Sequence, residues 1–367
     1  KGYPAPRRLP IRFDNYKREH LMPETLLDVR GLRLSFGTEE GTVRALFDVT
    51  FSVAPAETVG LVGESGCGKT VTALSILRLL SSPPAVVEGG EIRFRGEDLL
   101  ALPEKRMCGV RGKSISMIFQ EPMSSLNPVL TVGEQVAEVF TAHKVCGKRE
   151  AAERAVEWLR KVHMPDPERR AREYPHQMSG GMRQRAMIAM ALALEPALLI
   201  ADEPTTALDV TIQAQILSLL RELREREKMA VLLSSHDLGV VYDFADRTAI
   251  MHLGRIVEIA PTRELFADPV HPYTQGLLAS LPGKRTGEKR LASIPGTVPD
   301  LSLVPPGCPF ADRCPFRQDA LSRFRSGEIP EDTLAACDRD DPTPHEYAPG
   351  HFAACHHQRA VRGGGTP

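Results

Sequence analysis

The feature that most constrains this chain is the stretch Gly63-Glu64-Ser65-Gly66-Cys67-Gly68-Lys69-Thr70. It has the form G-x-x-x-x-G-K-[ST] of a phosphate-binding loop, in which backbone N–H groups surround phosphates at the start of a helix. The apolar residues 59–62 before it predict a buried strand, and residues 69–80 have helical periodicity. We therefore favour a nucleotide site over an ordinary glycine-rich turn, with Lys69 on the β and γ phosphates and the Thr70 hydroxyl on Mg²⁺.

Length and charge limit the alternatives. With 367 residues, the chain can form one large domain and a smaller appendage. Its 46 Lys and Arg balance 47 Asp and Glu, so there is no general basic field that would indicate nucleic acid as a partner. The longest apolar stretch, residues 186–194, is far shorter than the roughly 20 residues that cross a bilayer. We expect no membrane span, no signal peptide and a reducing, cytoplasmic location.

Strand-like and helix-like segments alternate around the loop. The expected strands are residues 26–29, 32–36, 49–53, 59–62, 91–94, 115–119, 197–201 and 231–235. The expected helices are residues 69–80, residues 131–163, a helix that begins at Ser179 and runs to about residue 194, and a helix with apolar residues at helical spacing from 212 to 223. This alternation predicts an α/β domain with a parallel-core sheet at residues 24–260. We expect a flexible basic arm at 1–23, a helix and proline-rich linker at 261–307, and a cysteine-containing extension at 308–367.

Several polar residues stand at the ends of these strands and helices. Ser179-Gly180-Gly181 opens a helix and is a second natural position for a phosphate. One strand ends in Asp202-Glu203, another presents His236, and a third ends at Gln120, which is where open α/β sheets place ligand chemistry. Taken alone, each could be an ordinary capped loop, a structural histidine or a loop amide.

Together, in this order and spacing, these elements resemble the nucleotide-binding subunit of an ABC transporter. The stretches EPMSSLNP at 121–128, YPHQ at 174–177, ALDVT at 207–211 and HPYT at 271–274 are similar to the oligopeptide/dipeptide importer ATPases. MRQRAMIAM at 182–190 resembles the D-type rather than the F-type subunit, with Met178 and Met182 departing from the commoner Leu and Gln. The resemblance implies a P-loop ABC ATPase domain, with an antiparallel β subdomain and a helical subdomain, plus a small irregular extension.

The resemblance also implies roles for the residues. Glu203 would be the general base, His236 would contact the γ-phosphate, Gln120 would link Mg²⁺ or water to the membrane partner, and Asp202 would hold Mg²⁺ indirectly. Phe36 would stack on adenine, whereas Phe47 and Phe51 are expected in the core. The remaining ligands that the resemblance implies are Gly63, Ser65, Gly66, Cys67 and Gly68 with Lys69 and Thr70 for the bound phosphates, Ser179, Gly180 and Gly181 for the γ-phosphate of the opposite subunit, and Asp209 at the dimer seam.

The implied function is ATP hydrolysis that drives import of di- or oligopeptides, at the cytoplasmic face of a bacterial cell membrane. The implied partners are a second ABC ATPase subunit (the F-type paralogue), two transmembrane permease subunits and, indirectly, an extracytoplasmic solute-binding protein, without nucleic acid. Three alternatives stay open: an importer for nickel or another small solute, an ABC ATPase that works on nucleic acid or ribosomes, and a redox-sensing module.

Four of the seven cysteines lie in the final sixty residues: Cys308, Cys314, Cys337 and Cys355. No C-x-x-C pair is present, so a zinc ribbon fits poorly, but four thiolates could hold a [4Fe–4S] cluster that orders a proline-rich segment. GCPF at 307–310, RCP at 313–315 and ACH at 354–356 resemble the importer family, whose members are reported to bind iron–sulfur there. Cys337 departs from the family spacing, with 22 residues between it and Cys314. Zinc with help from His351, His356 or His357, and free thiols, are the alternatives.

Overall fold

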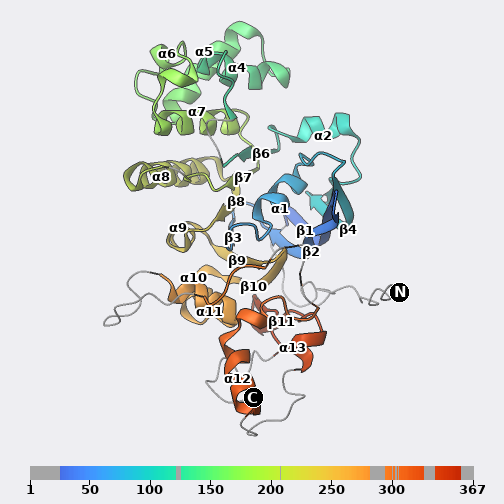
Figure 1. Cartoon of the computed structure of the whole chain (residues 1–367). Helices are drawn as coiled ribbons and strands as arrows, with labels where there is room; N and C mark the ends of the chain where they lie inside the picture. Colours follow the sequence, from blue (N-terminus) through green and yellow to red (C-terminus); the bar gives the residue numbers. More distant parts are fainter. Residues whose placement is uncertain are drawn as a thin grey trace.

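The computed structural model describes residues 25–120, 125–206, 208–281, 294–299, 301, 304, 306–325 and 335–356 (Figure 1). The predicted basic arm at 1–23, residues 121–124 and residues 282–293 of the predicted linker lie outside these ranges. The strands are β1 (Leu27–Thr38), β2 (Gly41–Val53), β3 (Thr58–Val62), β4 (Ala85–Phe94), β5 (Glu97–Asp98), β6 (Ile115–Ile118), β7 (Leu198–Asp202), β8 (Ala230–Ser235), β9 (Arg247–His252), β10 (Arg255–Pro261), β11 (His345–Ala348) and β12 (His351–Ala353). The helices are α1 (Lys69–Ile76), α2 (Glu104–Val110), α4 (Val132–Ala142), α5 (Lys148–Lys161), α6 (Pro167–Arg170), α7 (Gly180–Leu192), α8 (Val210–Glu227), α9 (Leu238–Phe244), α10 (Thr262–Ala267), α11 (Pro272–Ala279), α12 (Pro315–Arg325) and α13 (Ala335–Arg339), with short 3₁₀ turns at Pro175–Gln177 and Ala311–Arg313.

An eight-stranded sheet in the order β11-β12-β10-β9-β3-β8-β7-β6 forms the centre of the described chain. The four pairs from β9 through β3, β8 and β7 to β6 are parallel, which confirms the predicted parallel core, whereas β10 pairs with β9 antiparallel. In register, Val62 lies opposite Ser235, and Asp202 lies opposite Ser234. The carboxyl ends of β3, β7 and β8 therefore meet at one edge of the sheet, where α/β proteins bind ligands.

A second, antiparallel sheet in the order β2-β1-β4-β5 confirms the predicted β subdomain. Strand β1 is continuous from Leu27 to Thr38, although the sequence predicts two strands at 26–29 and 32–36. The interruption is a bulge: the pairing shifts register between Val29 and Leu32, and Gly31 has φ +56°. Bulges insert an extra residue without ending a strand, which is why the alternation of apolar residues breaks there.

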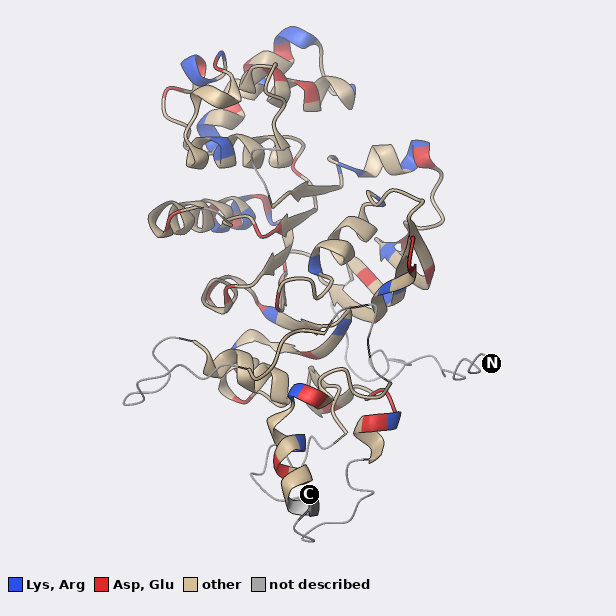
Figure 2. Cartoon of the chain, in the orientation of Figure 1, with Lys and Arg blue, Asp and Glu red and all other residues tan. Residues whose placement is uncertain are grey.

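Helices α4 to α7 form a separate layer, at the top of Figure 1, which matches the predicted helical subdomain. The predicted helical stretch 131–163 is two helices, α4 and α5. Thr131 begins α4 with a capping box, in which its hydroxyl accepts from Glu134 N and the Glu134 carboxylate accepts from Thr131 N. Charged residues of both signs are interspersed over these helices and the rest of the described chain (Figure 2).

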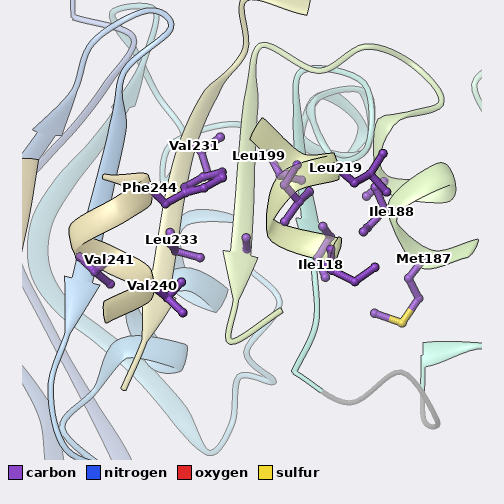
Figure 3. Close-up of a cluster of buried hydrophobic side chains, with 14 of the residues drawn as sticks. Ile118, Met187, Ile188, Leu199, Leu219, Val231, Leu233, Val240, Val241 and Phe244 are labelled. Carbon is purple, nitrogen blue, oxygen red and sulfur yellow. The ribbon is translucent and has the colours of Figure 1, made fainter. Parts of the chain in front are cut away.

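Both faces of the parallel strands are buried, as expected where helices cover a parallel sheet. On β8, Val231 and Leu233 belong to one apolar cluster, and Ala230 and Leu232 belong to another on the opposite face. Figure 3 shows the first cluster, with Leu199, Val231 and Leu233 of the sheet beside side chains of helices α7, α8 and α9. No described helix has the length and apolar character of a membrane span.

This packing predicts a large effect of truncating Leu219, a side chain of α8 that is 2% exposed. Replacing Leu219 by Ala should lower the free energy of unfolding by about 2–5 kcal/mol, because a cavity is left in a close-packed core. Val210, on the same helix and 84% exposed, provides the control. Val210→Ala should change stability by less than about 0.5 kcal/mol in the same urea titration. Equal midpoints for the two variants would contradict this account of the core.

The C-terminal extension contributes two strands to the core sheet, although the sequence suggests an irregular, strand-poor segment. β12 pairs with β10 through Glu258 opposite Ala353, and β11 pairs with β12. Without β12, strand β10 would expose a row of unpaired N–H and C=O groups, and covering such an edge is favourable. The sequence signal is weak because the two strands have only four and three residues.

Candidate nucleotide-binding site

The phosphate-binding loop joins β3 to α1, as predicted. Gly68 precedes α1 with φ +107°, a conformation that L side chains rarely adopt. A Cβ on Gly63 would come within 2.2 Å of the Met251 carbonyl oxygen. The glycines at both ends of the motif are therefore required by this tight turn. Helix α1 ends at Ile76 rather than at residue 80, and Arg78 just beyond it has φ +51°, which no α-helix accommodates.

Helix α1 has no side-chain cap at its N-terminus. In contrast, Ser179 caps α7 by accepting from Met182 N, and Asp209 caps α8 by accepting from Ile212 N. The first N–H groups of a helix have no partner within the helix, and the helix dipole makes this end positive. The uncapped start of α1 therefore fits a phosphate group.

Lys69 is buried inside the loop, with a side chain that is 4% exposed. Its Nζ donates to the carbonyl oxygens of Gly63 (2.8 Å) and Glu64 (3.2 Å), and it lies 3.6 Å from Glu203 Oε1. A buried ammonium needs such partners, because desolvation of an unpaired charge is unfavourable. The ammonium is thus held beside the loop and beside the carboxylate at the end of β7.

The Glu203 carboxylate lies at the centre of the predicted catalytic residues. Its Oε2 accepts hydrogen bonds from Gln120 Nε2 (3.2 Å) and Thr206 Oγ1 (3.0 Å), and His236 Nδ1 lies 3.1 Å from the same oxygen. Glu203 has φ +46°, and its N–H lies 3.1 Å from both Oγ and O of Ser234. Strained backbone of this kind is found at functional sites, where the surrounding structure fixes it.

Asp202, the residue before it, is 1% exposed and accepts a hydrogen bond from the Ser234 hydroxyl. Thr70 and Gln120 are exposed. A hydroxyl, an amide and a carboxylate are the oxygen ligands that Mg²⁺ prefers, so the chemistry of this donor set fits the metal. Sequence reasoning missed Ser234 and Thr206. Their signals are position alone: Ser234 is at the end of β8 beside His236, and Thr206 is three residues after Glu203.

The Ser179-Gly180-Gly181 motif begins α7, as predicted, although the helix ends at Leu192 rather than near residue 194. A Cβ on Gly181 would lie 2.9 Å from Ile212 Cγ2, so the motif packs closely on the start of α8. Gln184 is 1% exposed, and its Nε2 donates to the Pro204 carbonyl oxygen at 2.5 Å. In Figure 1, α7 lies in the helical layer, well separated from α1. The motif and the phosphate-binding loop of this one chain therefore do not come together.

The three phenylalanines near the loop have different environments. Phe36 is partly buried on β1, opposite Val43 and Ala85. Phe51 is 4% exposed and lies in the core, as expected. The expectation that Phe47 is a core residue is wrong: it is half-buried, and the guanidinium of Arg255 lies 4.1 Å from the centre of its ring. The face of an aromatic ring attracts a guanidinium. The sequence does not distinguish a phenylalanine in this environment from one in the core.

The cysteines of the extension are gathered but form no metal site in the described part of the chain. Cys308, Cys314 and Cys337 are each 9% exposed, Cys355 is half-buried, and Cys308 N donates to the Cys337 carbonyl at 2.8 Å. Burial, together with the neighbouring thiols, raises the pKa of Cys308 to about 12, and burial raises the pKa of Cys337 to about 11. No three His, Cys, Asp or Glu side chains among the described residues are arranged to hold a metal ion, so the predicted iron–sulfur cluster is not confirmed.

The histidines of the zinc alternative have other partners. His351 Nε2 lies 2.7 Å from Glu258 Oε1, and His356 Nε2 lies 2.8 Å from the Asp340 carbonyl oxygen. His357 lies outside the described residues.

Comparison with known proteins gives the same assignment along most of the chain. Residues 46–206 match the family described as ABC transporter, and residues 257–320 match the family described as oligopeptide/dipeptide transporter, C-terminal region. A solved dimeric ATP-binding cassette in a post-hydrolysis state, bound to ADP and Pi, has a TM-score of 0.58 and 28% identity, covering 65% of this chain and 99% of that one.

Curated relatives are more similar. A probable peptide ABC transporter ATP-binding protein of Sinorhizobium fredii (strain NBRC 101917 / NGR234) is 53% identical over 333 residues, which cover 90% of this chain and 95% of the relative. A dipeptide transport ATP-binding protein of Bacillus subtilis (strain 168) is 51% identical over 305 residues, with 83% and 91% covered. With the phosphate-binding loop, Glu203 and the family-typical C-terminal region in place, this chain belongs to the family of ATP-binding proteins of peptide ABC transporters.

Proposed function

We propose that this chain binds and hydrolyses ATP to power the import of di- or oligopeptides. The observation that carries the proposal is the convergence on Glu203: Lys69, Gln120 and His236 all lie within hydrogen-bonding or ion-pairing distance of one carboxylate. That carboxylate stands at the same sheet edge as the uncapped start of α1. The names of the relatives add the peptide as the transported solute.

In this proposal, the phosphates of ATP occupy the loop at Gly63, Ser65, Gly66, Cys67 and Gly68, and Lys69 turns from its carbonyl partners to the β and γ phosphates. Thr70 and Gln120 would hold Mg²⁺ directly and Asp202 would hold it indirectly, and the metal would supply positive charge at the phosphate oxygens. Phe36 stacks on adenine.

For the chemical step, we assign Glu203 as the group that accepts the proton of the attacking water. His236, 3.1 Å from Glu203 Oε2, is placed to contact the γ-phosphate and to orient that water. Thr206 and Gln120 donate to the same carboxylate oxygen and so hold the base in position. Through Gln120, the base would also be linked to the membrane partner.

The site needs a partner chain. Ser179, Gly180 and Gly181 are separated from α1 within this chain, so a second ABC ATPase subunit, the F-type paralogue, would supply the matching motif. Asp209, at the start of α8, would lie at the seam between the two subunits. The pair would dock on two permease subunits at the cytoplasmic face of a bacterial membrane and act with an extracytoplasmic solute-binding protein.

The alternative of an importer for nickel or another small solute is not favoured by the relatives, which are named for peptide transport. The discriminating experiment co-purifies the chain with its permeases and measures ATP hydrolysis with di- and oligopeptides, a nickel chelate and a glycoside. Stimulation by peptides alone supports the proposal, and stimulation by the nickel chelate alone would replace it.

We also propose that Cys308, Cys314, Cys337 and Cys355 are the ligands of a [4Fe–4S] cluster. Support comes from their burial and position: Cys308, Cys314 and Cys337 are each 9% exposed, Cys308 N donates to the Cys337 carbonyl, and the other three thiols lie near enough to Cys308 to help raise its pKa. Anaerobically purified protein should absorb in the visible range and contain about four iron atoms per chain. The double variant Cys308→Ser/Cys314→Ser should lose both signals. Zinc without iron, or neither metal, would remove the cluster from the account.

A redox-sensing role is tested by the same double variant. If transport and complex assembly are unchanged without these two thiols, the extension does not govern function through them.

A further inference from the structure

Glu64, the second residue of the phosphate-binding loop, has hydrogen-bond partners for its N–H, its carbonyl oxygen and its carboxylate. Its N–H donates to the Tyr273 hydroxyl (3.1 Å), and its carbonyl oxygen accepts from Lys69 Nζ (3.2 Å) and from Cys67 N (3.3 Å). Its carboxylate binds Arg313. Two of these partners belong to the loop itself, and the other two come from the C-terminal third of the chain.

Arg313 and Glu64 form a bidentate salt bridge. Arg313 Nη1 and Nη2 donate to the two carboxylate oxygens, both at 2.9 Å, across 249 residues of sequence. The Arg313 side chain is 5% exposed, and its Nε donates to the Pro295 carbonyl at 3.0 Å. A paired guanidinium and carboxylate with this geometry fix both distance and orientation, which a single hydrogen bond does not.

Phe310, Tyr273 and His252 form an aromatic cluster through which the extension packs beside the loop. Phe310, 1% exposed, packs edge-on against Tyr273 and against His252, with ring centres 5.3 and 5.4 Å apart. Tyr273 is the residue whose hydroxyl accepts from Glu64 N, and His252 Nδ1 lies 4.0 Å from Glu64 Oε2. Arg313 is therefore not an isolated surface ion pair. It is the polar part of a buried contact between the extension and the loop.

Glu64 is itself part of the loop assigned to the phosphates, so a shift of Glu64 moves the loop backbone, together with the carbonyl that accepts from Lys69 Nζ before the nucleotide binds. We propose that Arg313 is a positioning residue for the phosphate-binding loop: by holding Glu64, it makes the affinity for nucleotide phosphates depend on the docked C-terminal extension. This inference rests on the proposed ATP site. It makes the extension part of that site's support, in addition to any role of its cysteines.

The test measures the dissociation constant of a fluorescent N-methylanthraniloyl-ATP for the full chain and four variants: Arg313→Gln, Glu64→Gln, the double variant and Arg313→Lys. Each Gln variant should bind about 10-fold more weakly, since hydrogen bonds between charged groups are lost. The double variant should be no weaker than either single variant, because both remove the same contact. Arg313→Lys should recover part of the affinity, since Lys keeps the charge but not the two-bond geometry.

Arg255→Gln is the matched control. Arg255 also joins the extension to the core sheet through two hydrogen bonds, to Asp341 at 2.9 and 3.0 Å, but its partner is not in the loop. The Arg255→Gln variant should have a lower melting temperature than the wild type but the same affinity for the nucleotide. Unchanged affinity in Arg313→Gln, an equal loss in Arg255→Gln, or multiplied losses in the double variant would each overturn the inference. If Arg313→Gln does not fold, Glu64→Gln decides. Failure of the wild-type chain to bind nucleotide would instead reject the proposed function.

Discussion

Replacing Glu203 by Gln is expected to slow ATP hydrolysis by about 10²–10⁴-fold and to leave ATP binding nearly unchanged. Gln keeps the size of the side chain and can still bond Gln120 and Thr206, but it cannot accept a proton from water. Phosphate release by the assembled complex and binding of a fluorescent ATP analogue measure the two effects separately.

Glu225→Gln is the control for this experiment, because Glu225 is an exposed glutamate of α8. It should hydrolyse ATP at the wild-type rate. Retained turnover in Glu203→Gln would show that another group is the base, and His236 would be examined next because it lies beside the same oxygen.

Replacing Lys69 by Met is expected to weaken nucleotide binding by about 100-fold or more and to abolish hydrolysis with it. Met fills a similar volume in a position that is 4% exposed, so the loop should keep its packing while losing the ammonium. Charge-assisted hydrogen bonds contribute about 1.5–3 kcal/mol each, and Lys69 is assigned to two phosphates. Titration with the fluorescent analogue measures the loss.

Lys148→Met, at an exposed position that starts α5, is its control and should bind nucleotide as the wild type does. The contrast between the two catalytic variants is informative: Glu203→Gln should lose turnover alone, whereas Lys69→Met should lose binding as well. Normal affinity in Lys69→Met would remove the assigned role of the lysine.

The sequence was a good guide to the site where the chemistry is local. The loop motif, the carboxylate pair after an apolar strand and His236 after another are each specified within about ten residues. Parallel pairing of β3, β7 and β8 then brings them to one edge. Thr206 and Ser234 could not be predicted, because a hydroxyl near a strand end has many ordinary roles and only the fold shows its partner.

Contacts between segments that are far apart in the sequence could not be predicted. β12 is only three residues long, and its pairing with β10 joins residues about a hundred positions apart. Arg313 and Glu64 are separated by 249 residues, and neither has a local pattern that signals the other. The expectation that Phe47 lies in the core was also wrong, because the sequence does not distinguish a phenylalanine in the core from one that faces a guanidinium.

The most direct test of the account is peptide uptake by the full importer reconstituted in liposomes that contain ATP. The proposed function predicts that peptide accumulates inside only when solute-binding protein, permeases, both ATPase subunits and Mg²⁺ are present, and that Glu203→Gln in this chain reduces both accumulation and ATP hydrolysis. Peptide accumulation that continues at the wild-type rate with Glu203→Gln would contradict the claim that ATP hydrolysis by this chain powers transport.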